Sequence, residues 1–186
     1  MNRKSALYSY LLCALFAALT AICSQIMIPL PFTPIPINLA LLAVWVCGGV
    51  LGAKNGAIAI LVYILLGAIG APVFVGLQGG LGALAGPTGG YIVGYLPSVI
   101  VMGLLARRGL TADSGFLRFV FIIVRGILAA AACYACGTAW FMISTGTGFI
   151  PAMLMCVIPF IPGDILKLIA AEAVSAALRR AQKQKG

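Results

Sequence analysis

Apolar residues fill most of the chain, in six long runs that are separated by charged residues, prolines or clusters of glycine. The runs cover residues 6–28, 37–53, 55–71, 90–106, 116–143 and 151–178. A helix of about 20 apolar residues matches the hydrocarbon thickness of a bilayer. The pattern therefore predicts six transmembrane helices in a single membrane domain, residues 1–186. The first run is too long for the apolar core of a signal peptide, which favours a retained helix.

The composition indicates the same fold class. Hydrophobic residues make up 63% of the chain and charged residues 8%, whereas soluble domains carry about a quarter charged residues. We therefore expect an all-α integral membrane protein. The chain has no histidine, and Cys133 and Cys136 form an isolated C-x-x-C within an apolar run. We expect these thiols to pack in the bundle, and we expect neither a metal site nor a cofactor.

The basic residues predict how the chain is oriented. If Arg3 and Lys4 are cytoplasmic, the three outer connections carry no Lys or Arg. This one-sided distribution follows the positive-inside rule, so both termini are predicted to be cytoplasmic. The rule also explains the net charge of +9 without nucleic acid as a partner. Ten of the 12 basic residues are then cytoplasmic, namely Arg3, Lys4, Lys54, Arg107, Arg108, Arg118, Arg179, Arg180, Lys183 and Lys185.

Two of the outer connections are apolar and rich in residues that break helices. The segment MIPLPFTPIPINL has Pro29, Pro31, Pro34 and Pro36, which predicts an extended run. The second connection, residues 71–91, is rich in glycine and lacks the P-loop and dinucleotide-binding fingerprints. Two interpretations stay open for it: a packed re-entrant turn, or a lid over a small-molecule site.

Ionisable residues also lie within the predicted membrane spans. Glu172 and Arg125 are both about 12 Å from the cytoplasmic ends of their helices. An unpaired charge at the bilayer centre costs about 2.5 to 3.5 kcal/mol on insertion scales. We therefore predict a structural ion pair between Arg125 and Glu172.

Asp164 and Lys167 lie deeper, in the outer half of the last span. They are three residues apart, so both project from one face of the helix. They either neutralise each other or form a ligand site, and intramembrane ionisable residues favour a functional hypothesis. A carboxylate that accepts and an ammonium group that donates suit a neutral planar ligand with adjacent N–H and C=O groups, such as a urea.

Three segments together resemble a known family over nearly the whole chain. PFTPIPINL, GLQGGLGALAGPTGGYIVGY and IPGDILKLIAA, in this order, resemble BioY, the biotin-binding S component of energy-coupling-factor (ECF) transporters. The resemblance implies a subunit of the bacterial cytoplasmic membrane that captures biotin from outside. A transmembrane coupling subunit and two cytosolic ATPase subunits would be its partners. In this resemblance Asp164 would accept from the ureido N–H groups, and Lys167 would donate to the ureido oxygen.

The resemblance leaves the rest of the ligand site open. Biotin carries a carboxylate, yet no outer connection holds a basic residue. Candidates for this carboxylate are the backbone N–H groups of Gly79 and Gly80, the amide of Gln78, the hydroxyl of Tyr91, and Asn38. An apolar wall suits the bicyclic ring, and its candidates are Trp45, Tyr63, Phe74, Leu84 and Trp140.

A docking surface for the coupling subunit is predicted on the first helix. Membrane helices approach closely through small residues, and S components resemble one another in an Ala-x-x-x-Ala on this helix, a role that Ala14 and Ala18 would take here. The chain has no ATPase motif and no histidine base beside a nucleophile, so we expect no enzymatic activity. Alternatives are an S component for another vitamin and a proton-coupled secondary transporter, although residues 1–90 and 91–186 show no repeat.

Overall fold

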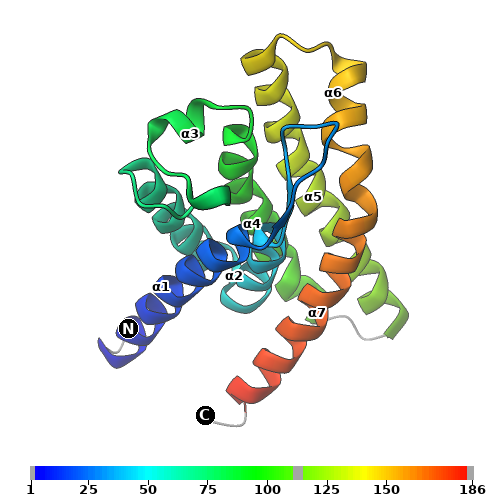
Figure 1. The fold of residues 1–186 in the computed structure, drawn as a ribbon. Coiled ribbons are helices and arrows are strands. Elements are labelled where there is room, and N and C mark those ends of the chain that lie inside the picture. Colours follow the sequence, from blue (N-terminus) through cyan, green and yellow to red (C-terminus); the bar gives the residue numbers. More distant parts are fainter. Residues whose placement is uncertain (1–2, 111–114, 184–186) are drawn as a thin grey trace.

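The structure is a computed structural model that describes residues 3–110 and 115–183, and nearly all of them are helical (Figure 1). The long helices are α1 (Arg3–Gln25), α2 (Ala40–Ala68), α4 (Gly89–Leu110), α5 (Gly115–Thr145) and α7 (Ile161–Lys183). Short elements lie between them, namely β1 (Met27–Ile28), β2 (Ile37–Asn38), the 3-10 helix η1 (Val75–Leu77), α3 (Leu81–Ala85), α6 (Phe149–Cys156) and the 3-10 helix η2 (Ile158–Phe160).

The range of α2 holds two of the six predicted helices. Gly52 has φ 76° and ψ 179°, so it interrupts the helix between them. A Cβ on Gly56 would lie 3.6 Å from the Cα of Gly48, whereas eight residues of continuous helix would separate the two by about 12 Å. The chain therefore reverses at Gly52. Among the described residues, five helical stretches have the length and composition to span a membrane. Because Gly52 divides one of them, they comprise six helices. The predicted class, an all-α membrane protein with six helices, is confirmed.

The Pro-rich connection forms no helix, as its prolines predict, but it is not one extended run: it is extended at its two ends and turns at residues 31–32 between them. β1 and β2 pair as antiparallel strands, with Met27 opposite Asn38 and Ile28 opposite Ile37. The predicted second connection, residues 71–91, contains η1 and α3. The predicted sixth span, residues 151–178, is divided into α6, η2 and α7, because the backbone is non-helical at Val157 and two prolines follow it.

Helix α4 lies at the centre of the bundle, between α5 and α2. Glycines allow this close packing: a Cβ on Gly103 would lie 2.3 Å from the backbone nitrogen of Ala53, and one on Gly94 would lie 2.9 Å from the carbonyl oxygen of Cys133. The largest fully buried side chains are those of Trp45, Tyr63, Phe74, Ile60 and Met102. Helix α7 packs mainly on α2 and makes few contacts with α5.

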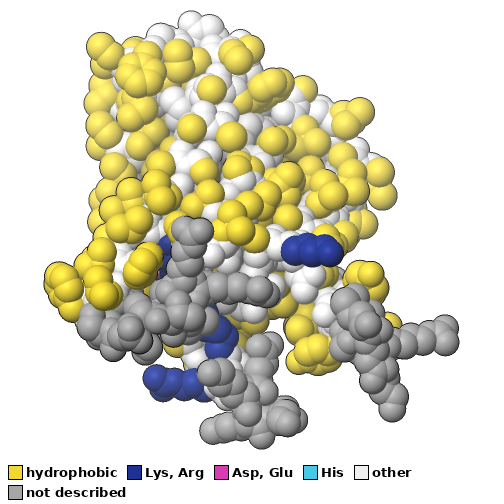
Figure 2. Space-filling view, turned by 180° about the vertical axis from the view of Figure 1, so that it is seen from behind, with side chains coloured by type: hydrophobic (Ala, Val, Ile, Leu, Met, Phe, Trp, Pro, Cys, Tyr) yellow, Lys and Arg dark blue, Asp and Glu magenta, His cyan; other side chains and the backbone are white. Residues whose placement is uncertain are grey.

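The surface is apolar along the helices and basic at one end. Large apolar side chains are exposed on each long helix, and Figure 2 shows Lys and Arg side chains gathered near the end that carries the termini in Figure 1. We call the opposite end of the bundle the outer end, after the predicted orientation. Lys54 and Arg180 are exposed. Lys185 and the side chains of Arg3, Lys4, Arg107, Arg108, Arg118 and Lys183 lie outside the described part of the structure.

Candidate ligand-binding site at the outer end of the bundle

The first turn of α7 carries the two ionisable residues of the candidate site. η2 ends at Phe160, and α7 begins at once with Ile161 and Pro162, so Asp164 lies where a helix N-terminus favours negative charge. Lys167 lies on the same face, with its Nζ 2.7 Å from Oδ1 of Asp164. Asp164 is 6% exposed and Lys167 is 7% exposed. The charges therefore compensate each other in a site that is almost closed to solvent.

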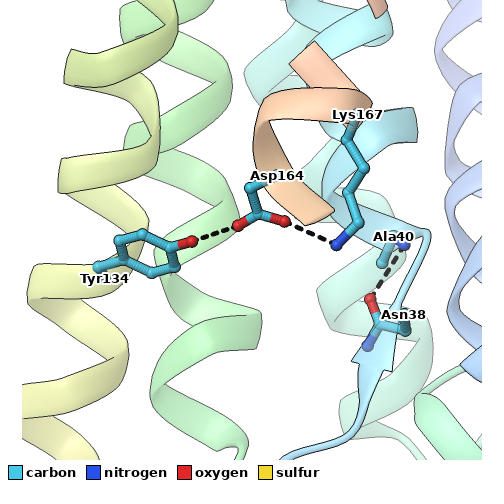
Figure 3. Close-up of polar contacts among 5 residues, drawn as sticks. All are labelled: Asn38, Ala40, Tyr134, Asp164 and Lys167. Atoms are coloured by element: carbon cyan, nitrogen blue, oxygen red, sulfur yellow. Dashed lines mark hydrogen bonds and ion pairs between the residues drawn. The ribbon is translucent and has the colours of Figure 1, made fainter. Parts of the chain in front are cut away.

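Tyr134 of α5 completes this polar group. Its hydroxyl donates a hydrogen bond to Oδ2 of Asp164, while Lys167 donates to Oδ1 (Figure 3). Each carboxylate oxygen thus has a protein donor and keeps a free lone pair for a ligand. The sequence analysis missed Tyr134. The available signal was a phenol within an apolar helix, since a buried Tyr hydroxyl usually finds a partner.

Asp164, Lys167 and Tyr134 line a cavity that we call the inner cavity. The walls come from α1, the Pro-rich connection, α2, α4, α5 and α7, and they hold the aromatic rings of Tyr63, Tyr91, Tyr95 and Phe160. The inner cavity has a volume of about 50 Å³. It adjoins a cavity of about 240 Å³ nearer the outer surface, which we call the outer cavity. Pro36, Val75 and Thr88 line both cavities.

Asn38 and Tyr91 also line the inner cavity, as the predicted site requires. Oδ1 of Asn38 accepts a hydrogen bond of 3.0 Å from the backbone N–H of Ala40 (Figure 3). This bond closes an Asx turn just before α2 and orients the rest of the amide. The Tyr91 hydroxyl donates to the carbonyl oxygen of Cys156 at 3.0 Å and lies 3.2 Å from Oγ1 of Thr138. Tyr91 therefore presents its ring to the cavity, while its hydroxyl is held by the protein.

Four predicted site residues lie elsewhere. Gln78 is exposed and lines the outer cavity, not the inner one. Gly79 and Gly80 line neither cavity, and the N–H of Gly80 donates to the carbonyl oxygen of Gly67 at 2.6 Å. Trp45 is fully buried beside the site, where its Nε1 donates to Ser98 Oγ at 3.1 Å. The backbone N–H of Gly80 is thus already paired with α2 and does not face either cavity.

The other candidates for the apolar wall also differ in position. Tyr63 lines the inner cavity, and Phe74 packs edge-on behind it with ring centroids 5.6 Å apart. Leu84 and Trp140 line a separate groove between α4 and α5. The aromatic wall of the inner cavity therefore comes from four elements, with Tyr63 of α2, Tyr91 and Tyr95 of α4, Tyr134 of α5 and Phe160 of η2.

Arg125 and Glu172 form the ion pair that their matched depths predict. Arg125 is 3% exposed, and neither residue lines the inner cavity. Arg179 lies nearby on α7 and donates to the carbonyl oxygen of Gly49 at 2.6 Å. This polar group joins α5, α7 and α2 on the side away from the outer end.

Helix α1 turns the predicted docking residues away from the bundle. Ala14 and Ala18 are exposed, and Leu11, Leu15 and Ile22 lie on the same side with 61%, 61% and 63% of their surface exposed. Among the described residues, no group of three His, Cys, Asp or Glu side chains is placed to hold a metal ion.

Comparisons with known proteins place the chain in a family. The model of the BioY family matches residues 1–184. The biotin transporter BioY of Rhizobium etli is 38% identical over 170 residues, which cover 90% of each protein, and that of Thermotoga maritima is 33% identical over 172 residues, which cover 92% of this chain and 95% of the relative. A crystal structure of the S-component for biotin from an ECF-type ABC transporter matches with a TM-score of 0.87 at 26% identity, over 97% of this chain and 95% of that one. This chain is a multi-pass membrane protein that belongs to the BioY family.

Proposed function

We propose that this chain is the biotin-binding S component of an ECF transporter and that biotin binds in the inner cavity. The observation that carries the proposal is the buried pair of Asp164 and Lys167, which lines a cavity at the outer end. Relatives named biotin transporters and the likeness to a biotin S-component support it.

The donors and acceptors of the site match a cyclic urea. Asp164 would accept from one ureido N–H group, and Lys167 would donate to the adjacent ureido oxygen. Tyr134 keeps the Asp164 carboxylate turned toward the cavity through its hydrogen bond to Oδ2. The rings of Tyr63 and Tyr95 offer apolar surface to the fused rings of biotin.

The valerate chain of biotin would point toward the outer cavity. Pro36 and Val75 line the passage between the two cavities, and Thr88 supplies a hydroxyl there. Among the described residues that line either cavity, Lys167 is the one basic residue. The carboxylate would therefore be held by neutral donors, among which are Thr88, Asn38 and Gln78. Neutral donors give weaker hydrogen bonds to a carboxylate than an arginine would.

Transport would depend on partner subunits. The chain would lie in the bacterial cytoplasmic membrane with both termini cytoplasmic, as its one-sided basic residues favour. A transmembrane coupling subunit would dock on the α1 face that carries Ala14 and Ala18. Two cytosolic ATPases would hydrolyse ATP, since this chain lacks an ATPase motif. This chain would then bind the vitamin and perform no chemical step.

A thermal-shift screen of the purified protein tests the proposed function. Biotin, riboflavin, thiamine and folate would each be added to the detergent-solubilised protein. A ligand that binds only the folded state raises the unfolding temperature. Biotin is expected to raise it and the other vitamins are not. A shift with another vitamin and none with biotin would overturn the proposal in favour of a different S component.

A further inference from the structure

The segment Val73–Gln78 forms a wall of both cavities. Val75 lines both of them, and Gly76 and Gln78 line the outer one. Two successive residues of this segment have left-handed backbone conformations, Gly76 with φ 69° and Leu77 with φ 56°. Leu77 is the one residue other than glycine with a positive φ in the described part of the chain. A leucine takes this conformation only where its surroundings hold it.

Leu77 gains little from burial. Its side chain is 68% exposed, so apolar packing does not explain its strained backbone. Phe74, at the other end of the segment, is fully buried against Tyr63, and its backbone N–H donates to the carbonyl oxygen of Gln78 at 3.0 Å. Packing therefore anchors one end of the segment, and hydrogen bonds must hold the turn at residues 76–77.

Gln25, the last residue of α1, makes these hydrogen bonds. Its Oε1 accepts from the backbone N–H of Leu77 at 2.9 Å, and its Nε2 donates to the carbonyl oxygen of Phe74 at 2.9 Å. Ser24 adds a hydrogen bond of 2.7 Å from its hydroxyl to the carbonyl oxygen of Val73. A single amide thus bridges a donor and an acceptor of the same turn, because it carries both an N–H donor and an oxygen acceptor.

We propose that Gln25 is a positioning residue that holds the segment Val73–Gln78 closed over the inner cavity and so slows the release of a bound ligand. Without the amide, the strained turn at Leu77 loses its support, and Val75 moves out of the cavity wall. Because Gln25 belongs to the helix that carries Ala14 and Ala18, movement of α1 on partner docking would open the same wall. The connection between partner docking on α1 and ligand release rests on the proposed function.

The test uses a native thiol of the inner cavity as its reporter. Cys133 lines this cavity and is 1% exposed. A charged, water-soluble methanethiosulfonate reagent reacts with Cys133 only when the cavity opens, and peptide mass spectrometry separates this thiol from the other five. Labelling is measured on the purified protein without biotin, so the result does not depend on which ligand the protein binds.

Gln25→Met keeps the size of the side chain and removes the hydrogen bonds of the amide, including those to Leu77 and Phe74. Its expected result is labelling of Cys133 about tenfold faster than in the original protein, as the loss of two hydrogen bonds allows. Gln25→Glu keeps the acceptor for Leu77 but turns a carboxylate oxygen toward the carbonyl oxygens of Phe74 and Val73, so Cys133 should also be labelled faster in it than in the original protein. The control is Thr145→Val, which removes a hydrogen bond to the carbonyl oxygen of Phe141 elsewhere at the outer end and should leave the rate unchanged.

Biotin dissociation gives the second readout. Gln25→Met should speed both the dissociation and the association of biotin, because both require the same wall to open. Equal labelling of Cys133 in the original protein, Gln25→Met and Gln25→Glu would overturn the proposal. If Gln25→Met does not fold, the comparison of Gln25→Glu with the original protein decides. If the original protein binds no biotin, the proposed function fails, and the labelling result still tests the role of Gln25.

Discussion

At the scale of single residues, the need to compensate buried charge explains both intramembrane ion pairs. Asp164 pairs with Lys167 within α7, and Arg125 pairs with Glu172 between α5 and α7. The first pair lines the inner cavity and the second does not. The first pair therefore has a place for a ligand beside it, whereas the second serves the packing of the helices.

Tyr134→Phe should weaken biotin binding. The substitution keeps the ring and removes the hydroxyl that donates to Asp164, so the carboxylate loses one of its two protein donors. The expected loss of affinity is about tenfold, the size of one hydrogen bond to a charged group. Competition with radiolabelled biotin measures it, and Tyr10→Phe, at an exposed position of α1, is the control. Equal affinity of the two variants would contradict the role of Tyr134.

Glu172→Gln should lower the thermal stability of the protein in detergent. It leaves Arg125 buried without its counter-charge, and breaking a buried pair in this way costs about 3 to 5 kcal/mol. The double variant Arg125→Met with Glu172→Met removes both charges and should unfold at a higher temperature than Glu172→Gln. A double variant that is less stable than the single one would show that the pair does more than neutralise charge.

The ionisable part of the site could be predicted from the sequence, and much of the rest could not. Asp164 and Lys167 are three residues apart on one helix, so helical geometry places them together. Arg125 and Glu172 were paired by their depth in the bilayer. Tyr134 reaches Asp164 only through the packing of α5 beside α7, which no local pattern encodes.

At the scale of secondary structure, glycines determine how the helices meet. The reversal at Gly52 uses φ 76° and ψ 179°, a conformation that is essentially restricted to glycine. The adjacent Gly103 allows α4 to pass within contact of this turn. The sequence pattern separated the two helices here because Lys54 interrupts the apolar run, but the structure shows that Gly52 makes the turn.

Gly52→Ala should therefore destabilise the protein. The added Cβ strains the turn by about 1 to 3 kcal/mol, because φ is 76° there. Gly82→Ala is a matched control, because Gly82 has open space for a Cβ. Thermal unfolding in detergent compares the two, and a Gly52→Ala variant as stable as the control would contradict the proposed constraint on this turn.

Helix α1 should provide the docking surface for the coupling subunit. The double variant Ala14→Trp with Ala18→Trp places two large rings on an exposed face of α1, where they would prevent close approach of another helix. Co-purification with the coupling subunit should be lost while biotin binding is kept. Recovery of the intact complex would show that the subunit docks elsewhere.

The number of helices and the absence of helix from the Pro-rich connection could be predicted from periodicity and prolines, whereas its turn at residues 31–32 could not. The pairing of β1 with β2 could not, because its register depends on how the connection packs on the bundle. Gln25 was missed for a similar reason, since its hydrogen bonds reach residues about 50 positions away in the sequence. Long-range backbone contacts of polar side chains leave no local signal.

At the scale of the whole molecule, the structure separates a ligand end from a basic end. The inner and outer cavities lie at the outer end, while Lys and Arg side chains gather near the end that carries the termini (Figures 1 and 2). This polarity fits a subunit that takes up its ligand on one side of the membrane and is orientated by its basic residues on the other.

Isothermal titration of the purified protein with biotin tests the central claim most directly. The original protein would be compared with Asp164→Asn and Lys167→Met, each checked for folding by thermal unfolding. Tight binding by the original protein and a loss of about tenfold to a hundredfold in each variant is the predicted result, since each removes a hydrogen bond to a charged group. Folded variants that bind biotin as tightly as the original protein would contradict the assignment of Asp164 and Lys167 to the biotin site.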